Sequence, residues 1–371
     1  MGKEWGMAAL ALHAIVLAAG EGTRMRSERP KPLHRLCGRS MAAHVLDALA
    51  ELELELGKVV VVVGHRAPLV TKTLSAEAPG SMRIEFVEQA VARGTGDATA
   101  VALGGLPEDD EEADVVVLPG DTPLLRPPTL AALVRHHRRT AAAATLLSAV
   151  LDEPTGYGRV VRSESGAVLS IAEDTDATEQ QREIKEVGTS IYCFRRSLLA
   201  PALRRLSPAN FHNEYYLTDV IGVLSSAGYP VSALVCQDPV EAAGVNDRAQ
   251  LAVAEAEVRD RINERWMRRG VTMWDPERTY VDAGVELSPD VALWPGVVLR
   301  GRCVVGRGTE IGPDVTLVDT LVGEGGEVRC SVCEGATIGP RARVGPFVHL
   351  GPGAVVSEGE IVGPFESRPH R

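Results

Sequence analysis

The sequence lacks a long basic stretch. Its 371 residues include 39 lysines and arginines against 50 aspartates and glutamates, which gives a formal net charge of −11. This balance does not favour nucleic acid or an anionic membrane surface as a partner. A phosphate-bearing ligand must then be held by a few local cations and a metal ion rather than by the field of the whole protein.

Membrane-length apolar runs are also absent, and cysteines are few. The apolar run at residues 8–19 is interpreted as the start of the first strand and not as a secretion signal, because His13 interrupts it. The six cysteines are scattered, which favours the reducing cytoplasm. Cys330 and Cys333 are interpreted as two small apolar residues of a repeat, with a zinc site as the alternative.

What the sequence does contain is a glycine-broken loop after a short apolar strand. Residues 14–17 form an uninterrupted apolar run, as in buried parallel strands. Gly20 and Gly22 follow, and Arg24 and Lys31 add positive charge. Backbone N–H groups in such a turn, with a helix beyond, bind anions, so a nucleotide triphosphate is expected here. The loop fits neither the P-loop pattern nor G-x-G-x-x-G.

Strand and helix patterns alternate through the first two hundred residues. This alternation predicts a mostly parallel sheet with helices on both faces. Ligands of such sheets bind at the carboxyl ends of the strands, where the glycine loop lies. The predicted strands are residues 58–63, 83–87, 114–118 and 143–150, and the predicted helices are residues 41–56 and 130–138.

Two oxygen-bearing side chains are candidate ligands for Mg²⁺. Asp121 follows the strand at residues 114–118, at the same sheet edge as the glycine loop. A turn aspartate is the alternative. Asn246 precedes a long amphipathic helix, and its amide oxygen can ligate a hard cation, although a helix N-cap is the alternative. Beside a phosphate loop, the metal site is the favoured interpretation for both.

A third motif, Gln89 with Gly94 and Thr95, is a candidate base-binding site. A side-chain amide together with bare backbone groups can recognise the edge of a pyrimidine. The Gly-Thr-Gly segment also opens a predicted helix, so a threonine cap is an alternative that can hold at the same time.

After Gly270 the sequence becomes repetitive. Aliphatic residues recur at every sixth position up to Leu317 and, after a shift, from Val332 onward. This hexapeptide pattern predicts a β-helix in which each aliphatic side chain points into the interior. Because a solenoid has open ends and flat faces, we expect several copies to pack together.

Residues 17–25 (LAAGEGTRM) and 30–33 (PKPL) resemble the signature of sugar-phosphate nucleotidyltransferases. With the repeat, the chain resembles, from about residue 14 to residue 365, the bacterial bifunctional UDP-N-acetylglucosamine pyrophosphorylase and glucosamine-1-phosphate acetyltransferase family. The resemblance implies an α/β fold, with a Rossmann-like nucleotidyltransferase sheet at residues 1–246 and a linker helix at residues 247–270. It further implies a left-handed parallel β-helix at residues 271–371, through which the family forms homotrimers.

The resemblance also implies roles for individual residues. Arg24, Lys31 and Asp121 would be catalytic, and Asp121 and Asn246 would hold Mg²⁺. The implied nucleotide-binding residues are Leu17, Ala18, Ala19, Gly20, Glu21, Gly22, Thr23, Lys31, Gln89, Gly94 and Thr95. The implied sugar-binding residues are Gly158, Glu173, Gly188, Tyr216 and Thr218.

The sequence departs from the family pattern at several positions. The pattern E-[IV]-N-T-G beginning at Glu186 has Gly188 in place of the asparagine and Ser190 in place of the final glycine, so the sugar pocket should be reshaped. Ala92 replaces a glutamine of the base loop. Gly351 replaces an arginine, and the chain stops before most acetyltransferase residues of the family. We therefore expect a truncated β-helix and no acetyl transfer.

The resulting prediction is a cytoplasmic, Mg²⁺-dependent enzyme that acts on UTP and N-acetylglucosamine-1-phosphate. Its products would be UDP-N-acetylglucosamine and pyrophosphate. One alternative is the same chemistry on another amino or modified sugar-1-phosphate, or with dTTP. Another is a non-catalytic scaffold that binds nucleotide sugars.

Overall fold

The computed structural model describes residues 10–368, so the first two residues of the apolar run at 8–19 lie outside the described part. The chain divides into two compact units, each described by itself. The first contains the chain up to His34 and residues 40–250, and the second contains residues 35–39 and 251–371. Within the second unit, the Cys37 amide N–H donates to Glu255 Oε2 at 2.9 Å, which ties the short segment to the helix that follows residue 250.

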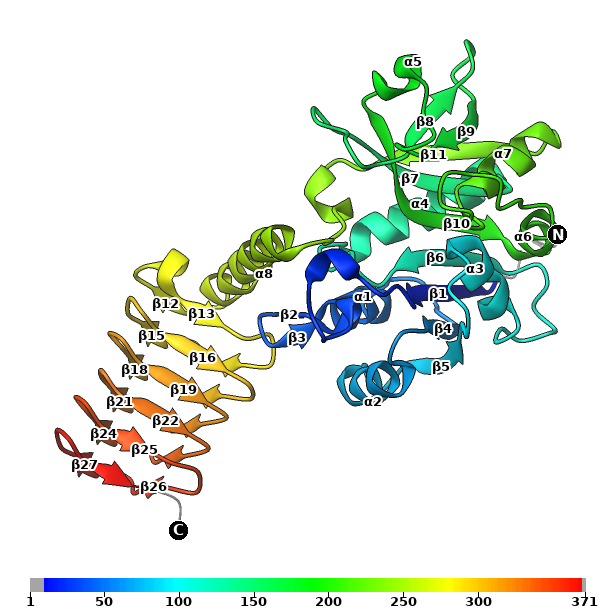
Figure 1. Cartoon of the computed structure of the whole chain (residues 1–371). Helices are drawn as coiled ribbons and strands as arrows, with labels where there is room; N and C mark the ends of the chain where they lie inside the picture. Colours follow the sequence, from blue (N-terminus) through cyan, green and yellow to red (C-terminus); the bar gives the residue numbers. More distant parts are fainter. Residues whose placement is uncertain (1–9, 369–371) are drawn as a thin grey trace, which may run out of the picture. The chain divides into compact units, whose positions relative to one another are not determined.

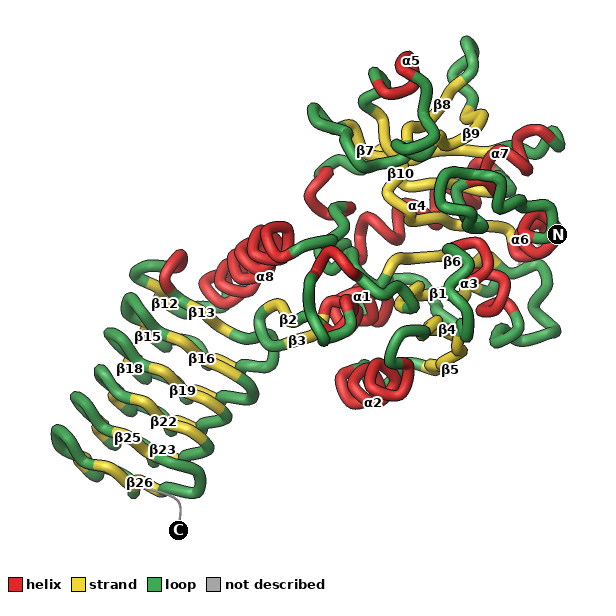
Figure 2. Tube along the Cα trace, in the orientation of Figure 1, coloured by secondary structure: helices red, strands yellow, loops and turns green. Residues whose placement is uncertain are grey.

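The first unit is built on one twisted sheet with the strand order β11-β7-β10-β6-β1-β4-β5 (Figures 1 and 2). Neighbouring strands on this path are parallel, except that β10 runs antiparallel to both β6 and β7. A small antiparallel pair, β8 and β9, extends from β10. The strands are β1 (Leu12–Ala18), β4 (Lys58–Val63), β5 (Arg83–Glu88), β6 (Asp114–Pro119), β7 (Ala144–Val150), β8 (Arg159–Arg162), β9 (Val168–Ala172), β10 (Glu186–Arg195) and β11 (Val231–Val235).

Helices cover both faces of this sheet, and each face has its own core. Val16 of β1 packs into one core and Ile15 into the other, as alternation along a strand requires. The helices of the first core are α1 (Met41–Ala50), α2 (Ala67–Glu77) and α4 (Pro127–Thr140). Those of the second are α3 (Thr95–Leu103), α6 (Arg196–Leu203) and α7 (Asp219–Ser226). A short helix, α5 (Glu179–Arg182), precedes β10. The predicted α/β fold class is confirmed.

The helix predicted at residues 41–56 is wrong in its length. Helix α1 ends at Ala50, and Leu52 turns into the core with 9% of its surface exposed. Three glutamates, at positions 51, 53 and 55, would otherwise occupy the last turns of the helix. Negative charge is unfavourable there because it faces the negative end of the helix dipole. The other predicted elements of the sheet unit differ from the observed ones by three residues or fewer at each end.

The long helix α8 (Arg248–Arg268) begins one residue after Asp247. The Gln250 amide N–H donates to Asp247 Oδ1 at 2.8 Å, so Asp247, and not Asn246, caps the helix. Farther along, Asn263 Nδ2 donates to the carbonyl oxygens of Pro276 and Thr279, both at 2.9 Å. These bonds attach α8 to the first turns of the solenoid within the second unit. Among the described residues, no helix combines the length and apolarity needed to span a membrane.

The rest of the second unit is a left-handed parallel β-helix with three sheets (Figure 1). Aliphatic residues at the repeat positions, such as Leu299 and Ile311, are fully buried in its interior. The repeat prediction is wrong at Val332, which is 40% exposed, because Cys333 takes the inward position. The interior residues Leu317 and Val322 are five positions apart, as are Val328 and Cys333, and Cys333 and Ile338. Three sides are therefore one residue shorter than the hexapeptide.

The strands of the three solenoid sheets are two or three residues long. One sheet contains β12 (Thr272–Met273), β15 (Ala292–Leu293), β18 (Glu310–Ile311), β21 (Glu327–Val328), β24 (Arg343–Val344) and β27 (Ile361–Val362). The second contains β13 (Tyr280–Val281), β16 (Val298–Arg300), β19 (Thr316–Val318), β22 (Val332–Glu334), β25 (His349–Leu350) and β28 (Ser367–Arg368). The third contains β14 (Glu286–Leu287), β17 (Val304–Val305), β20 (Leu321–Val322), β23 (Thr337–Ile338) and β26 (Val355–Val356). A separate two-stranded sheet pairs β2 (Arg35–Leu36) with β3 (Arg39–Ser40).

Candidate active site

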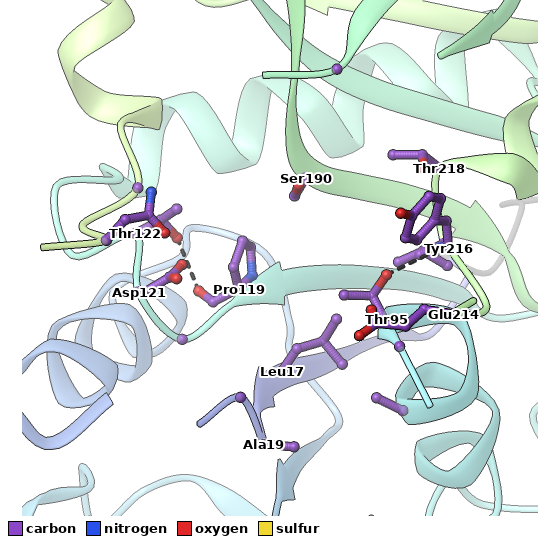
Figure 3. Close-up of a pocket in the computed structure, with 18 of the residues that line it drawn as sticks. Leu17, Ala19, Thr95, Pro119, Asp121, Thr122, Ser190, Glu214, Tyr216 and Thr218 are labelled. Carbon is purple, nitrogen blue, oxygen red and sulfur yellow. Dashed lines mark hydrogen bonds between the residues drawn. The ribbon is translucent and has the colours of Figure 1, made fainter. Parts of the chain in front are cut away.

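A cleft of about 1080 Å³ opens in the first unit at the carboxyl ends of β1 and β6. Figure 3 shows Asp121 and Thr122 on one side of it and Glu214, Tyr216 and Thr218 on the other. Every site residue predicted from the sequence lines this one cleft, from the glycine loop to the sugar-binding candidates. The structure therefore brings together residues that are more than two hundred positions apart in the chain.

The glycine loop is shaped by contact with Lys31. Gly22 has φ +65°, and a Cβ atom there would lie 2.5 Å from Lys31 Cβ, so only glycine allows the lysine to pack against the loop. The helix expected beyond the loop is a single 3-10 turn, η1 (Thr23–Met25). A turn this short has almost no dipole. Anion binding here must therefore depend on loop N–H groups and on the side chains of Arg24 and Lys31.

The two cations meet the two candidate metal ligands. Lys31 Nζ forms an ion pair with Asp121 and donates to Asn246 Oδ1 at 2.8 Å. Arg24 Nη2 donates to the same Asn246 oxygen at 2.9 Å. Because Asp247 caps α8, the amide of Asn246 is left to face the cleft. A carboxylate and an amide oxygen thus already share one cation, the lysine ammonium.

This donor set fits a hard divalent cation. Carboxylate and amide oxygens are the ligands that Mg²⁺ takes from proteins, and it keeps water and phosphate oxygens as its other ligands. The ammonium of Lys31 stands in for such a cation between Asp121 and Asn246. Among the described residues no group of three or more histidines, cysteines or carboxylates could hold a metal by protein side chains alone. The two-ligand site therefore suits a metal that arrives with a phosphate ligand.

The base-binding candidates are held by bonds within the protein. Gln89 is 7% exposed, and its Nε2 donates to the Gly94 carbonyl at 3.1 Å and to Asp97 Oδ2 at 2.7 Å. Its amide oxygen remains as an acceptor, which matches the N3–H of uracil or thymine. The threonine-cap alternative is wrong, because Thr95 Oγ1 accepts the Leu217 N–H at 3.0 Å and Gly94 occupies the cap position.

The far end of the cleft contains a buried carboxyl group. Thr218 Oγ1 donates to Glu173 Oε1 at 2.8 Å. Burial raises the pKa of Glu173, and the nearby carboxylates of Asp219 and Asp176 raise it further, although the Thr218 bond partly offsets them. The bare backbone of Gly158 and Gly188 lines the same end, with the Gly188 N–H donating to the Gly158 carbonyl at 2.8 Å.

Sequence reasoning gave no role to Arg159 and Asp174, which support this end of the cleft. Arg159 is 3% exposed and pairs with Asp174 at 2.9 Å. Asp174 Oδ2 also accepts the Gly156 N–H at 3.0 Å, which fixes the glycine turn before β8. Opposite charges at the ends of two adjacent strands are the only sequence signal for this pair. Tyr157 was also missed; it lines the cleft, and burial raises the pKa of its hydroxyl, with the charge of Asp121 adding to the effect.

The chain is similar to known proteins over most of its length. Residues 14–207 match the family model of the MobA-like NTP transferase domain. The chain is 46% identical to the bifunctional protein GlmU of Thermobifida fusca, over 88% of this chain and 67% of that protein. It is 46% identical to the bifunctional protein GlmU of Nocardia farcinica, over 95% of this chain and 71% of that protein. The bifunctional protein GlmU of Heliobacterium modesticaldum is 41% identical, over 95% of this chain and 75% of that protein.

Proposed function

Because this chain belongs to the GlmU family of bifunctional proteins and is a nucleotidyltransferase, we propose that it transfers the uridylyl group of UTP to N-acetylglucosamine-1-phosphate. The products are UDP-N-acetylglucosamine and pyrophosphate. The observation that carries the proposal is the meeting of Arg24 and Lys31 with Asp121 and Asn246 beside the glycine loop.

The reaction joins two anions. A phosphate oxygen of the sugar-1-phosphate attacks the α-phosphorus of UTP, the bond to the bridging oxygen breaks, and pyrophosphate leaves. The attacking oxygen is already ionised, so no general base is required. Catalysis then consists of positioning and charge neutralisation. Arg24 and Lys31, next to the loop N–H groups, neutralise the charge that develops on the leaving pyrophosphate.

Mg²⁺ dependence is part of the proposal, with Asp121 and Asn246 as the protein ligands. When bound, the ion supplies positive charge that offsets the repulsion between the two phosphates. Lys31 must then leave its position between these two oxygens. Its flexible four-carbon stem lets the ammonium turn toward the incoming phosphates, where it is needed for the leaving group.

The identity of the base depends on Gln89. Its amide oxygen accepts from the N3–H that uracil and thymine share, so this contact supports a pyrimidine of that type without separating UTP from dTTP. A second candidate function, the same transfer to a modified sugar-1-phosphate, is favoured by one observation. Ser190 projects into the cleft from β10 (Figure 3). Gly188, which also lines the cleft, has no side chain to place there.

A substrate panel tests the proposal. Pyrophosphate release is measured with UTP and dTTP against N-acetylglucosamine-1-phosphate, glucosamine-1-phosphate and glucose-1-phosphate, with Mg²⁺ and with chelator. The expected result is the highest kcat/KM for UTP with N-acetylglucosamine-1-phosphate and no release with chelator. A clear preference for another sugar would establish the second candidate. Nucleotide binding without release for any pair would leave a non-catalytic scaffold.

We further propose that the β-helix assembles the chain as a homotrimer. On the sheet that contains β17, β20 and β26, Val304, Leu321 and Val355 point outward and are 40%, 47% and 62% exposed. A row of exposed aliphatic side chains on a flat sheet favours burial against another copy. Sedimentation equilibrium tests the trimer.

The absence of acetyl transfer is also part of the proposal. It is supported by Gly351, which has no side chain where the resemblance implies an arginine. The six cysteines are all unpaired, and a cytoplasmic location is proposed on that basis. An assay of thiol release from acetyl-coenzyme A with glucosamine-1-phosphate is expected to show no activity above background.

A further inference from the structure

Strand β10 is irregular where it passes the cleft. Its register against β7 shifts between Gly188 and Tyr192. Thr189 also lines the cleft, and its Oγ1 donates to the Leu147 carbonyl at 2.8 Å. Ser190, between them, has φ +60°, a left-handed conformation that a residue with a side chain adopts only at a cost. Bulges of this kind re-aim a side chain beside a functional site.

The re-aimed side chain is that of Ser190. It is exposed within a strand that is otherwise largely buried, and it lines the cleft. Figure 3 shows it projecting from β10 toward the space between Asp121 and Thr218. The strained backbone therefore places a hydroxyl group inside the cleft, on the side away from the glycine loop.

A second hydroxyl lies beside it without a partner. Tyr192 is 1% exposed and lines the same cleft, and its hydroxyl has no hydrogen-bond partner among the described residues. Its ring is fixed by stacking on Phe194, with centroids 5.4 Å apart. Burial raises the pKa of Tyr192, and the nearby Ser190 side chain acts weakly in the opposite direction, so the phenol stays a neutral donor within reach of the Ser190 hydroxyl. A buried donor with no acceptor is unfavourable unless a ligand supplies one.

The surface next to the two hydroxyls is bare and apolar. A Cβ atom on Gly158 would lie 2.7 Å from Ile171 Cγ2, and one on Gly188 would lie 3.3 Å from Ile171 Cδ1. Both glycines therefore leave room for the methyl groups of Ile171, which is 5% exposed and belongs to the cleft wall. Glu173 lies at the same end and provides a carboxyl oxygen. The wall thus offers donors, an acceptor and an apolar patch to one small group.

An acylamino substituent has the matching chemistry: a carbonyl that accepts, an N–H that donates, and an apolar tail. We propose that Ser190 and Tyr192 form a hydroxyl pair that selects the sugar-1-phosphate by the carbonyl oxygen of an acylamino substituent on its ring. The proposal rests on the proposed function and adds the residues that decide the sugar. Ser190 is then a specificity-determining residue, and its strained backbone is the cost of that role.

The test compares two sugars in variants that remove one hydroxyl each. Ser190→Gly deletes the hydroxyl and relieves the left-handed strain, so the variant should fold at least as well, which a melting curve checks. Tyr192→Phe deletes only the phenolic oxygen. We expect each to lower kcat/KM about fivefold to tenfold with N-acetylglucosamine-1-phosphate and less than about twofold with glucose-1-phosphate, the size of one hydrogen bond. Ser225→Ala, which removes a hydroxyl that donates to the Val168 carbonyl and does not line the cleft, should not alter the ratio between the two sugars.

Equal losses with both sugars, or no loss with either, would overturn the hydroxyl pair. Calorimetric binding of the two sugar phosphates in the presence of a non-hydrolysable UTP analogue makes the same comparison without turnover. If the wild-type chain releases no pyrophosphate from any pair, the proposed function fails, and the binding ratios in Ser190→Gly and Tyr192→Phe still decide the hydroxyl pair. A selective loss of affinity for the acylamino sugar supports it, and unchanged ratios refute it.

Discussion

The two ends of the cleft differ in how completely their polar groups are satisfied. At the phosphate end, Asp121 and Asn246 already hold the ammonium of Lys31, and Arg24 completes the group. At the sugar end, the hydroxyl groups of Tyr192 and Tyr216 are buried without partners in the described part of the chain. At the first end the polar groups are paired before any ligand arrives, with one positive charge in excess. At the second end two hydroxyl groups have no hydrogen-bond partner.

This difference indicates two kinds of recognition. Opposite charges at the phosphate end protect each other from the cost of burial, so this end is stable without a ligand. Under the proposed function, a metal ion that arrives with the nucleotide replaces the Lys31 ammonium there. Neutral hydroxyls at the sugar end gain a hydrogen bond only from the correct ligand, and they discriminate because a wrong ligand leaves them unpaired. We therefore expect mutations at the phosphate end to lower the rate of pyrophosphate release. Mutations at the sugar end should instead change the preference among sugar-1-phosphates.

The largest effect is expected at the phosphate end. Asp121→Ala and Arg24→Ala should each reduce kcat for pyrophosphate release by about a hundredfold or more, since each removes a charge that the transition state needs. The measurement is a coupled pyrophosphate assay at saturating substrates. Asp152→Ala is the matched control, because Asp152 is exposed and does not line the cleft. Near-normal pyrophosphate release by either cleft variant would contradict the catalytic role assigned to that residue. The phosphate end would then not differ from the sugar end in its effect on rate.

An intermediate effect concerns the cation exchange itself. Lys31→Met removes the ammonium that competes with a metal for Asp121 and Asn246. In the absence of nucleotide, Mn²⁺ titrated by electron paramagnetic resonance should then bind roughly tenfold tighter than to wild type, a difference of about 1.4 kcal/mol.

The control for this exchange is Lys58→Met. Lys58 pairs with Glu85 on neighbouring strands and does not line the cleft, so its removal should leave Mn²⁺ affinity unchanged. Equal or weaker Mn²⁺ binding by Lys31→Met would show that the lysine does not occupy the position of the metal.

The smallest effect is expected from the carboxyl group at the sugar end. Burial raises the pKa of Glu173, and Asp219 and Asp176 raise it further, while Thr218 and the more distant His212 act in the opposite direction. A raised pKa in the folded state means that the stability contributed by this group is present at low pH and is lost as pH rises through the raised value. Glu173→Gln should therefore gain melting temperature relative to wild type as pH increases from about 4 to about 8.

Glu183→Gln is the control for this pH series, because Glu183 is exposed and does not line the cleft. It should show no gain that grows with pH. A difference between Glu173→Gln and wild type that stays constant across the series would mean that the carboxyl keeps its ordinary pKa in the folded chain.

Local patterns in the sequence were enough for the fold class. Continuous apolar strands, turn glycines and the six-residue repeat are short-range properties, and they predicted the alternating sheet and the solenoid. The prediction failed at two positions, where local charge ended a helix and a shortened repeat changed which residue points inward. The glutamates after Ala50 ended α1 early, and a five-residue side between Cys333 and Ile338 moved the inward position from Val332 to Cys333.

For the site, the sequence by itself determined the candidate residues for phosphate, metal and base, because each type of ligand requires particular side chains near glycine turns. Only the tertiary structure decided how those residues are used. It gave the cap of α8 to Asp247 and so freed Asn246 for Lys31, and it placed Arg159 against Asp174. It also placed Ser190 in the cleft through a shift in strand register. The physical reason is that a hydrogen bond or ion pair depends on distance and direction between groups far apart in the chain, and packing alone fixes these.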